Sequence, residues 1–246
     1  MRIGVFDSGV GGLTVLKELV KYHPDQEYIY FGDTKNLPYG TKSKEELLDI
    51  ASHIIDFLIA QDVKIIFIAC GTISATIYES LSEKYKIPLV NVIDTTIAEI
   101  KRRGLNEVAV LATSATIESH TFKNKLPNVK VMEISCSKFV PIIENQIDQK
   151  FKKLYIEQYL KPIKKDHIGD IILGCTHYPL IEDDIKAYLG EVNCYNMGTI
   201  LAQSTYLKPD KYDLTIYFSH IYDGLSDKVN NILNTKVEIK EESNIS

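Results

Sequence analysis

The feature that most constrains the fold of this chain is a regular alternation of short apolar runs with helix-like segments. Runs typical of buried strands occur at RIGVF (2–6), EYIYF (27–31) and VKIIFIA (63–69), and a helix-like segment follows each. This alternation is typical of parallel sheets that carry helices on both faces. We therefore expect an α/β protein.

The same alternation continues along the chain, which predicts roughly nine strands. That number is more than one small doubly wound sheet usually carries. Helices are expected at 12–22, 43–62, 74–86, 94–103, from about 114 to 126, within 138–164, and up to 189. Further strands are expected at 87–93, 107–113, 129–135, 170–174, 192–197, 213–219 and 237–241, and no helix is assigned between the last three. Ser43 and Glu46 have the spacing of a capping box at the start of the second helix.

The chain also repeats one pattern, which suggests two related lobes. IIFIACGTISA (65–75) and DIILGCTHYPL (170–180) both have an apolar strand, a small residue, a Cys and then a Thr within two residues. We expect two pseudo-symmetric lobes, each a mainly parallel sheet with helices on both faces, and an active site in the cleft between them. The first lobe is predicted to comprise 1–92 plus 207–246, and the second 93–206.

Composition and charge exclude several classes of protein. The net charge of −5 is well mixed, and no basic run suggests binding to nucleic acid. No stretch is long and apolar enough to span a membrane, and the N-terminal apolar run stops at Asp7, too early for a signal peptide. We expect a cytoplasmic protein. Its four cysteines form no CxxC pair, which argues against a zinc site and against a disulfide scaffold.

Two of the cysteines stand where chemistry is expected. Ligands of open parallel sheets bind beyond the carboxyl ends of the strands. Cys70 and Cys175 each end a predicted strand before a probable helix N-terminus, where the helix dipole lowers a thiol pKa toward neutrality. Either cysteine alone is better explained as a small buried residue, and its position at a strand end is what favours a chemical role. Cys136 and Cys194 lack this setting and are interpreted as structural.

A facing pair of thiols suits the inversion of a stereocentre. One group removes a proton from one face, and the other delivers a proton to the opposite face. Asp7, at the end of the first strand, is a candidate to orient or activate Cys70, with a turn cap as the alternative. His177 is a candidate proton partner for Cys175, because an imidazole titrates near neutral pH. A zinc site at Cys175 and His177 lacks a second pair of ligands.

Other polar segments offer binding groups for a small substrate. The spacing of DSGVGG (7–12) does not fit a dinucleotide motif, and we expect its glycine N–H groups to form a nest for a carboxylate. Tyr39 and Gly40 either belong to an ordinary turn or close one side of the pocket. Thr113 and Thr116 are either helix caps or ligands for a second carboxylate.

Taken together, these motifs closely resemble those of the glutamate racemase family of bacteria. The order and spacing match across roughly residues 3 to 185. The segments that carry the resemblance are IGVFDSGVGGLTVLKEL (3–19), GDTKNLPYGTKS (32–43), ATSATIES (112–119), FVPIIE (139–144) and ILGCTHYPLI (172–181).

The resemblance implies an activity and a set of site residues. It implies racemisation of glutamate by two cysteines without cofactor or metal, supplying D-glutamate for peptidoglycan, in a protein that is often a homodimer. Cys70 and Cys175 resemble the two acid–base thiols, Asp7 and His177 resemble their partners, and Glu144 resembles a further acidic residue near the site. The implied substrate contacts are Asp7, Ser8, Tyr39, Gly40, Gly71, Thr72, Thr113, Thr116, Thr176 and His177.

The chain departs from the family pattern beside its first cysteine. The family usually has Ala-Cys-Asn-Thr-Ala, whereas Gly71 follows Cys70 here and offers only its backbone N–H. Losing one hydrogen bond to a charged group costs about 1.5–3 kcal/mol if nothing replaces it. YNMGTILAQ (195–203) also stands where the family more often has an Asp-Ser-Gly-like turn. An aspartate or hydantoin racemase of the same superfamily is therefore an alternative, and a non-catalytic amino-acid-binding regulatory protein is a more distant one.

Overall fold

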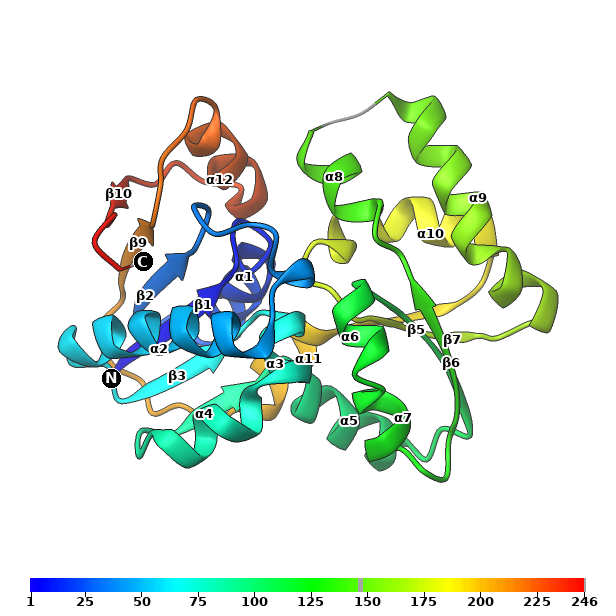
Figure 1. The fold of residues 1–246 in the computed structure, drawn as a ribbon, viewed down its shortest axis with the longest axis horizontal. Coiled ribbons are helices and arrows are strands. Elements are labelled where there is room, and N and C mark those ends of the chain that lie inside the picture. Colours follow the sequence, from blue (N-terminus) through cyan, green and yellow to red (C-terminus); the bar gives the residue numbers. More distant parts are fainter. Residues whose placement is uncertain (146–147, 246) are drawn as a thin grey trace.

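The chain forms two parallel sheets that lie side by side (Figure 1). The structure is a computed structural model, and it describes residues 1–145 and 148–245. The first sheet has the order β10-β9-β2-β1-β3-β4 and the second the order β6-β5-β7-β8, with every recorded pairing parallel. The strands are β1 Arg2–Asp7, β2 Glu27–Gly32, β3 Ile65–Ile68, β4 Leu89–Asn91, β5 Glu107–Ala112, β6 Lys130–Ser135, β7 Asp170–Leu173, β8 Asn193–Asn196, β9 Asp213–Phe218 and β10 Ile239–Glu241.

Helices cover both faces of both sheets, which confirms the predicted fold class. The α-helices are α1 Leu13–Tyr22, α2 Lys44–Ala60, α3 Gly71–Thr76, α4 Tyr78–Lys84, α5 Val92–Arg103, α6 Ser114–Glu118, α7 Thr121–Lys125, α8 Phe139–Glu144, α9 Gln149–Asp166, α10 Glu182–Leu189, α11 Met197–Ser204 and α12 Leu225–Leu233. Two 3₁₀ turns, η1 Tyr39–Thr41 and η2 Tyr178–Ile181, lie next to strand ends.

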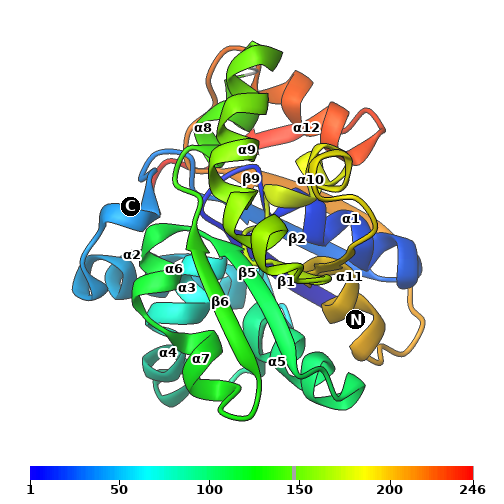
Figure 2. The ribbon, with the colours of Figure 1, turned by 90° about the vertical axis from the view of Figure 1, so that its right-hand side faces the viewer.

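The hydrophobic core has three parts, and the middle one is shared by the two sheets. In the middle part, Val5 of β1 and Val110 of β5 belong to one cluster with α1, α5, α11 and α12. A second part packs α2, α3 and α4 on the outer face of the first sheet. The third packs α9 and α10 on the outer face of the second sheet, which Figure 2 shows with α9 in front of the strands. The shared cluster holds the two sheets in contact.

Several expected helices differ from the observed ones. The capping box is confirmed, since Ser43 and Glu46 exchange hydrogen bonds of 3.1 Å and 2.8 Å at the start of α2. The single helix expected at 74–86 is instead α3, which begins at Gly71, followed by α4. The helical stretch expected within 138–164 contains α8 and α9, and its residues 146 and 147 lie outside the described part of the chain. The helices α11 and α12 were not expected from the sequence.

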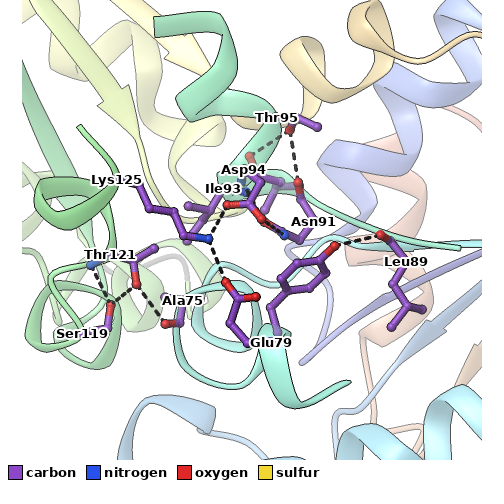
Figure 3. Close-up of polar contacts among 12 residues, drawn as sticks. Ala75, Glu79, Leu89, Asn91, Ile93, Asp94, Thr95, Ser119, Thr121 and Lys125 are labelled. Atoms are coloured by element: carbon purple, nitrogen blue, oxygen red, sulfur yellow. Dashed lines mark hydrogen bonds and ion pairs between the residues drawn. The ribbon is translucent and has the colours of Figure 1, made fainter. Parts of the chain in front are cut away.

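Polar contacts join segments of the two sheets on the side shown in Figure 3. The Nζ of Lys125 in α7 lies 2.7 Å from Asp94 Oδ1 and 3.1 Å from Glu79 Oε1. The hydroxyl of Thr121 donates to the carbonyl of Ala75 at 3.0 Å. Since α7 follows β5 and Ala75 follows β3, these contacts fix the helices of one sheet against those of the other.

The chain passes between the sheets twice, over α5 on the way out and over α11 on the way back. The predicted lobe boundaries, 1–92 plus 207–246 and 93–206, remain a prediction, because the shared cluster continues across them. Among the described residues, no helix is both long enough and apolar enough to cross a membrane.

Candidate active site

A cavity of about 280 Å³ lies beyond the carboxyl ends of strands from both sheets. The loops after β1, β3, β5 and β7 all contribute to its wall, as expected for parallel strands that end at one edge. Cys70 and Cys175 both line it, and both are nearly sealed from solvent, with exposed fractions of 3% and 7%. The residues expected from the sequence that line the cavity are Asp7, Ser8, Tyr39, Gly40, Cys70, Gly71, Thr72, Thr113, Cys175, Thr176 and His177.

Cys70 occupies the N-cap position of α3, two residues after the end of β3. Burial and then the charge of Asp7 raise the pKa of its thiol above the ordinary value. The N–H of Ile73 and the side chain of Ser8 lower this pKa, but by less. The expectation that the helix N-terminus lowers the Cys70 pKa toward neutrality is therefore wrong. Desolvation and a neighbouring carboxylate outweigh the dipole of a helix only six residues long.

Asp7 is the last residue of β1, and its two carboxylate oxygens have different hydrogen-bonding surroundings. Its Oδ2 accepts hydrogen bonds from the N–H groups of Gly12 at 2.7 Å and Gly9 at 3.3 Å. Its Oδ1 is buried and has no hydrogen-bond partner among the described residues. The N–H groups of Gly9 and Gly12 thus bind Asp7 itself, and the expectation that they form a nest for a ligand carboxylate is wrong. Burial raises the pKa of Asp7, against the lowering effects of His177 and these N–H groups.

Cys175, His177 and Glu144 form a chain of contacts at the second thiol. The Sγ of Cys175 lies 3.8 Å from His177 Nδ1, and His177 Nε2 lies 2.8 Å from Glu144 Oε1. Burial acts to lower the pKa of His177, but its hydrogen bonds to Cys175 and Glu144 raise it to about 10. Burial likewise acts to raise the pKa of Glu144, whereas the hydrogen bond from His177 lowers it overall. These two contacts therefore favour the protonated form of the His177 side chain more than in an ordinary histidine.

Glu144 itself does not line the cavity that holds the thiols. It contacts His177 from α8 and lines a neighbouring cavity of about 550 Å³ between α8, α9 and α12. The structure thus brings Glu144 to the site through His177.

The predicted threonines form a short hydroxyl chain across the two lobes. The Oγ1 atoms of Thr72 and Thr113 lie 3.2 Å apart, and those of Thr113 and Thr116 lie 3.0 Å apart. Thr113 is the N-cap of α6, which confirms the helix-cap interpretation. Thr113 also lines the cavity, and its role as a ligand for a second carboxylate stays a prediction. Thr116 is buried behind Thr113 and is not among the lining residues.

Tyr39 is held in the wall of the cavity by a carboxylate that sequence reasoning missed. Its hydroxyl donates to Asp33 Oδ2 at 2.7 Å, and Ser219 Oγ donates to Asp33 Oδ1 at 2.6 Å. Asp33 follows the last residue of β2, and Ser219 follows the last residue of β9. The rule that active residues follow strand ends, applied to every strand, identifies both.

A third cysteine also borders the cavity. Cys136 directly follows β6, lines the cavity wall and is fully buried, and burial raises the pKa of its thiol. The interpretation that Cys136 lacks a strand-end setting is wrong. Cys194, inside β8, lines a separate cavity. Within the described residues, no three His, Cys, Asp or Glu side chains are grouped to hold a metal ion.

Two buried thiols from two parallel sheets line one cavity, and one lies beside a carboxylate while the other lies beside an imidazole. This arrangement defines a class of proteins with paired acid–base groups. The family model described as Asp/Glu/Hydantoin racemase matches residues 3–205, and the chain belongs to this family.

Several similar proteins are glutamate racemases. The glutamate racemase of Hydrogenobaculum sp. is 41% identical over 98% of this chain and 96% of its own length. The glutamate racemase of Francisella tularensis, solved with D-glutamate, has a TM-score of 0.87 and 32% identity, covering 98% of this chain and 97% of its own. The glutamate racemase of Aquifex pyrophilus has a TM-score of 0.86 and 32% identity, covering all of both chains. The resemblance carried by the sequence motifs is thus confirmed.

Proposed function

We propose that this protein interconverts L- and D-glutamate by proton transfer between the substrate and the two thiols Cys70 and Cys175. The observation that carries the proposal is that two buried thiols from different sheets line one cavity. One thiolate removes the Cα proton, and the other thiol returns a proton to the opposite face, which inverts the configuration. The names of its relatives and the D-glutamate bound to one of them support glutamate as the substrate.

Asp7 serves Cys70 in this mechanism. Its unpaired Oδ1 is the acceptor that remains for the proton of Cys70 or for the ammonium group of the substrate. A buried acceptor without a partner costs about 1–3 kcal/mol, and a bound ammonium group removes that cost.

His177 and Glu144 serve Cys175. The imidazolium beside the Cys175 sulfur stabilises the thiolate when it forms, and it supplies the proton when Cys175 acts as the acid. Glu144 holds the imidazole in place from the side away from the cavity. The two faces of the site therefore use different partners for the same chemistry.

The substrate carboxylates are bound by hydroxyl and backbone groups in the cavity wall. Thr72, Thr113 and Thr176 supply hydroxyls, and the backbone of Gly71 and Cys175 lies in the same cavity wall. Donors fixed in advance stabilise the charge that develops on the α-carboxylate as the proton leaves. D-Glutamate made in this way supplies peptidoglycan synthesis. Location in the cytoplasm and assembly as a homodimer remain predictions.

Three cysteine variants test the proposal. Purified protein, treated with a chelator to remove metal ions, is assayed with L- and D-glutamate. Racemisation is followed by circular dichroism and by loss of the NMR signal of the Cα proton in deuterated water. The wild type is expected to racemise glutamate, and Cys70→Ser and Cys175→Ser are each expected to lose at least about 10²-fold in kcat, as for removal of a positioned acid–base group. Cys194→Ser, a thiol outside the cavity, is the matched control and should keep full activity. Full activity of either cavity variant would refute the paired mechanism.

A further inference from the structure

Gly71, the residue after Cys70, lies against the backbone of the loop that carries Cys175. A Cβ atom at position 71 would lie 2.8 Å from the carbonyl oxygen of Gly174 and 3.8 Å from Cε of Met197. Real Cβ atoms essentially never approach a heavy atom closer than 3.0 Å. The backbone of Gly71 lies outside the left-handed region, so its conformation does not require glycine. In this structure a Cβ atom at position 71 therefore requires a shift of the surrounding backbone.

Gly174, the residue that carries this carbonyl group, is itself closely packed on the second sheet. The N–H of Gly174 donates to the carbonyl of Leu111 in β5 at 2.7 Å. A Cβ atom at position 174 would itself lie 2.8 Å from that carbonyl oxygen and 3.1 Å from Cβ of Ala112. The loop after β7 is therefore packed tightly on β5 behind the point that Gly71 touches.

A second glycine, Gly11 in the loop between β1 and α1, also packs on the loop after β7. A Cβ atom at Gly11 would lie 2.4 Å from both Thr176 Oγ1 and His177 Nδ1. Beside it, the hydroxyl of Thr14 donates to the Thr176 carbonyl at 2.8 Å. The segment from Gly174 to His177 is thus enclosed by Gly11 and Gly71, and it contains Cys175.

We propose that Gly71 is a positioning residue that sets the separation of Cys70 and Cys175 across the cavity. Gly71 follows one thiol and Gly174 precedes the other, so the contact between them fixes how closely the two strand ends approach. Even one added methyl group moves α3 and the loop after β7 apart. This role rests on the proposed racemase function, in which displacement of a reacting group by about 1 Å can cost 10²-fold in rate.

The contrasting explanation of Gly71 predicts the opposite effects. If glycine merely lacks the amide group that the family's usual asparagine offers the substrate, then Gly71→Asn should raise activity and Gly71→Ala should be neutral. If Gly71 sets the separation, both substitutions lower activity, because both add a Cβ atom beside the Gly174 carbonyl. The signs of the two effects therefore decide between the explanations.

The experiment compares Gly71→Ala and Gly71→Asn with Gly169→Ala as the matched control, since a Cβ atom at Gly169 meets nothing within 4 Å. We expect kcat for glutamate to fall by about 10-fold or more in both Gly71 variants. The upper limit is the loss of about 10²-fold that a displacement of about 1 Å can cause. In the control, kcat should be unchanged. The isotope effect with glutamate deuterated at Cα should rise, because proton transfer becomes slower; a smaller amount of folded enzyme would not change it. Wild-type kcat in Gly71→Ala, or increased kcat in Gly71→Asn, would overturn the proposal.

A structural measurement separates this proposal from the racemase assignment. In crystal structures of the wild type and Gly71→Ala, the distance from the Cα of residue 71 to the Gly174 oxygen should increase by a few tenths of an ångström. An unchanged distance would overturn the role of Gly71 whatever reaction the protein catalyses. Absence of racemisation by the wild type, with an increased distance in the variant, would overturn the proposed function and leave the packing role standing.

Discussion

At the scale of single residues, the two thiols of the cavity are chemically unequal. Cys70 lies beside a buried carboxylate, and burial together with that charge raises its pKa. Cys175 lies 3.8 Å from the imidazole of His177, whose pKa is raised to about 10. The surroundings of Cys70 therefore favour its neutral thiol form, whereas the group beside Cys175 is an imidazole that favours its charged form.

Glu144 should affect the reaction only through His177. Glu144→Gln removes the negative charge that raises the pKa of His177 and keeps a side chain of similar size. We expect kcat to fall by about 10–10²-fold, at the lower end of the effect of a general acid–base group, and the pH profile of kcat to shift.

The control for this variant is Asp148→Asn, an exposed acidic residue of the same neighbouring cavity, because asparagine also serves as the N-cap of α9. An unchanged rate and pH profile for Glu144→Gln would contradict the role of Glu144.

Residue types at strand ends were the most informative sequence signal for the site. The rule that ligands bind beyond the carboxyl ends of parallel strands identified Asp7, Cys70 and His177. It works because these strand ends lie at one edge of the sheet. It missed Asp33, although the segment 32–43 was singled out, and it missed Cys136, which belongs to no motif that was considered. The pKa of Cys70 was not predictable, since burial is a property of the folded cavity and not of the local sequence.

At the scale of secondary-structure elements, local sequence signals account for some helices and tertiary packing accounts for others. The helix α2 has 17 residues, a capping box and acidic residues in its first turn, and the sequence predicted its start correctly. By contrast, α11 and α12 have only eight and nine residues. Helices this short are not stable alone, and they form here because they pack on α1. The N-cap residue Asn196 before α11 is a signal that the sequence contains but that was not recognised.

The capping box makes a prediction for α2. Ser43→Ala removes the side-chain acceptor for the Glu46 N–H. We expect the free energy of unfolding in urea to fall by about 0.5–2 kcal/mol. We expect kcat to be unchanged, since Ser43 is not among the residues that line the cavity. Ser43→Asp should retain most of the stability, because aspartate is an equally good cap. A change in kcat with unchanged stability would contradict this interpretation.

At the scale of the whole molecule, the active site exists only because two sheets are held against each other. The shared hydrophobic cluster, the contacts of Lys125 and the close packing at Gly71 all act across the same interface. The repeat between residues 65–75 and 170–180 correctly predicted two related sheets. The closeness of their approach was not predictable, since it depends on backbone contacts between segments far apart in the sequence.

Stability should depend on pH through His177. Its pKa is about 6.5 in the unfolded chain and about 10 in the folded protein. Its contribution to stability is therefore complete below about pH 6.5 and is lost as pH rises toward 10. The difference in unfolding free energy between the wild type and His177→Gln, measured in urea from pH 6 to 10, should shrink across this range. A difference that stays constant or grows with pH would contradict the raised pKa.

The distribution of deuterium between substrate and product in the first turnovers tests the two-thiol mechanism most directly. The wild type is mixed with L-glutamate in deuterated water, the reaction is stopped at a few per cent conversion, and both enantiomers are analysed by mass spectrometry. With two thiols, D-glutamate should carry deuterium at Cα while the remaining L-glutamate keeps its proton, because different groups remove and return it. The same should hold starting from D-glutamate. Product that retains the original proton, or deuterium entering the remaining substrate as fast as the product, would show that one base acts on both faces and would contradict the account.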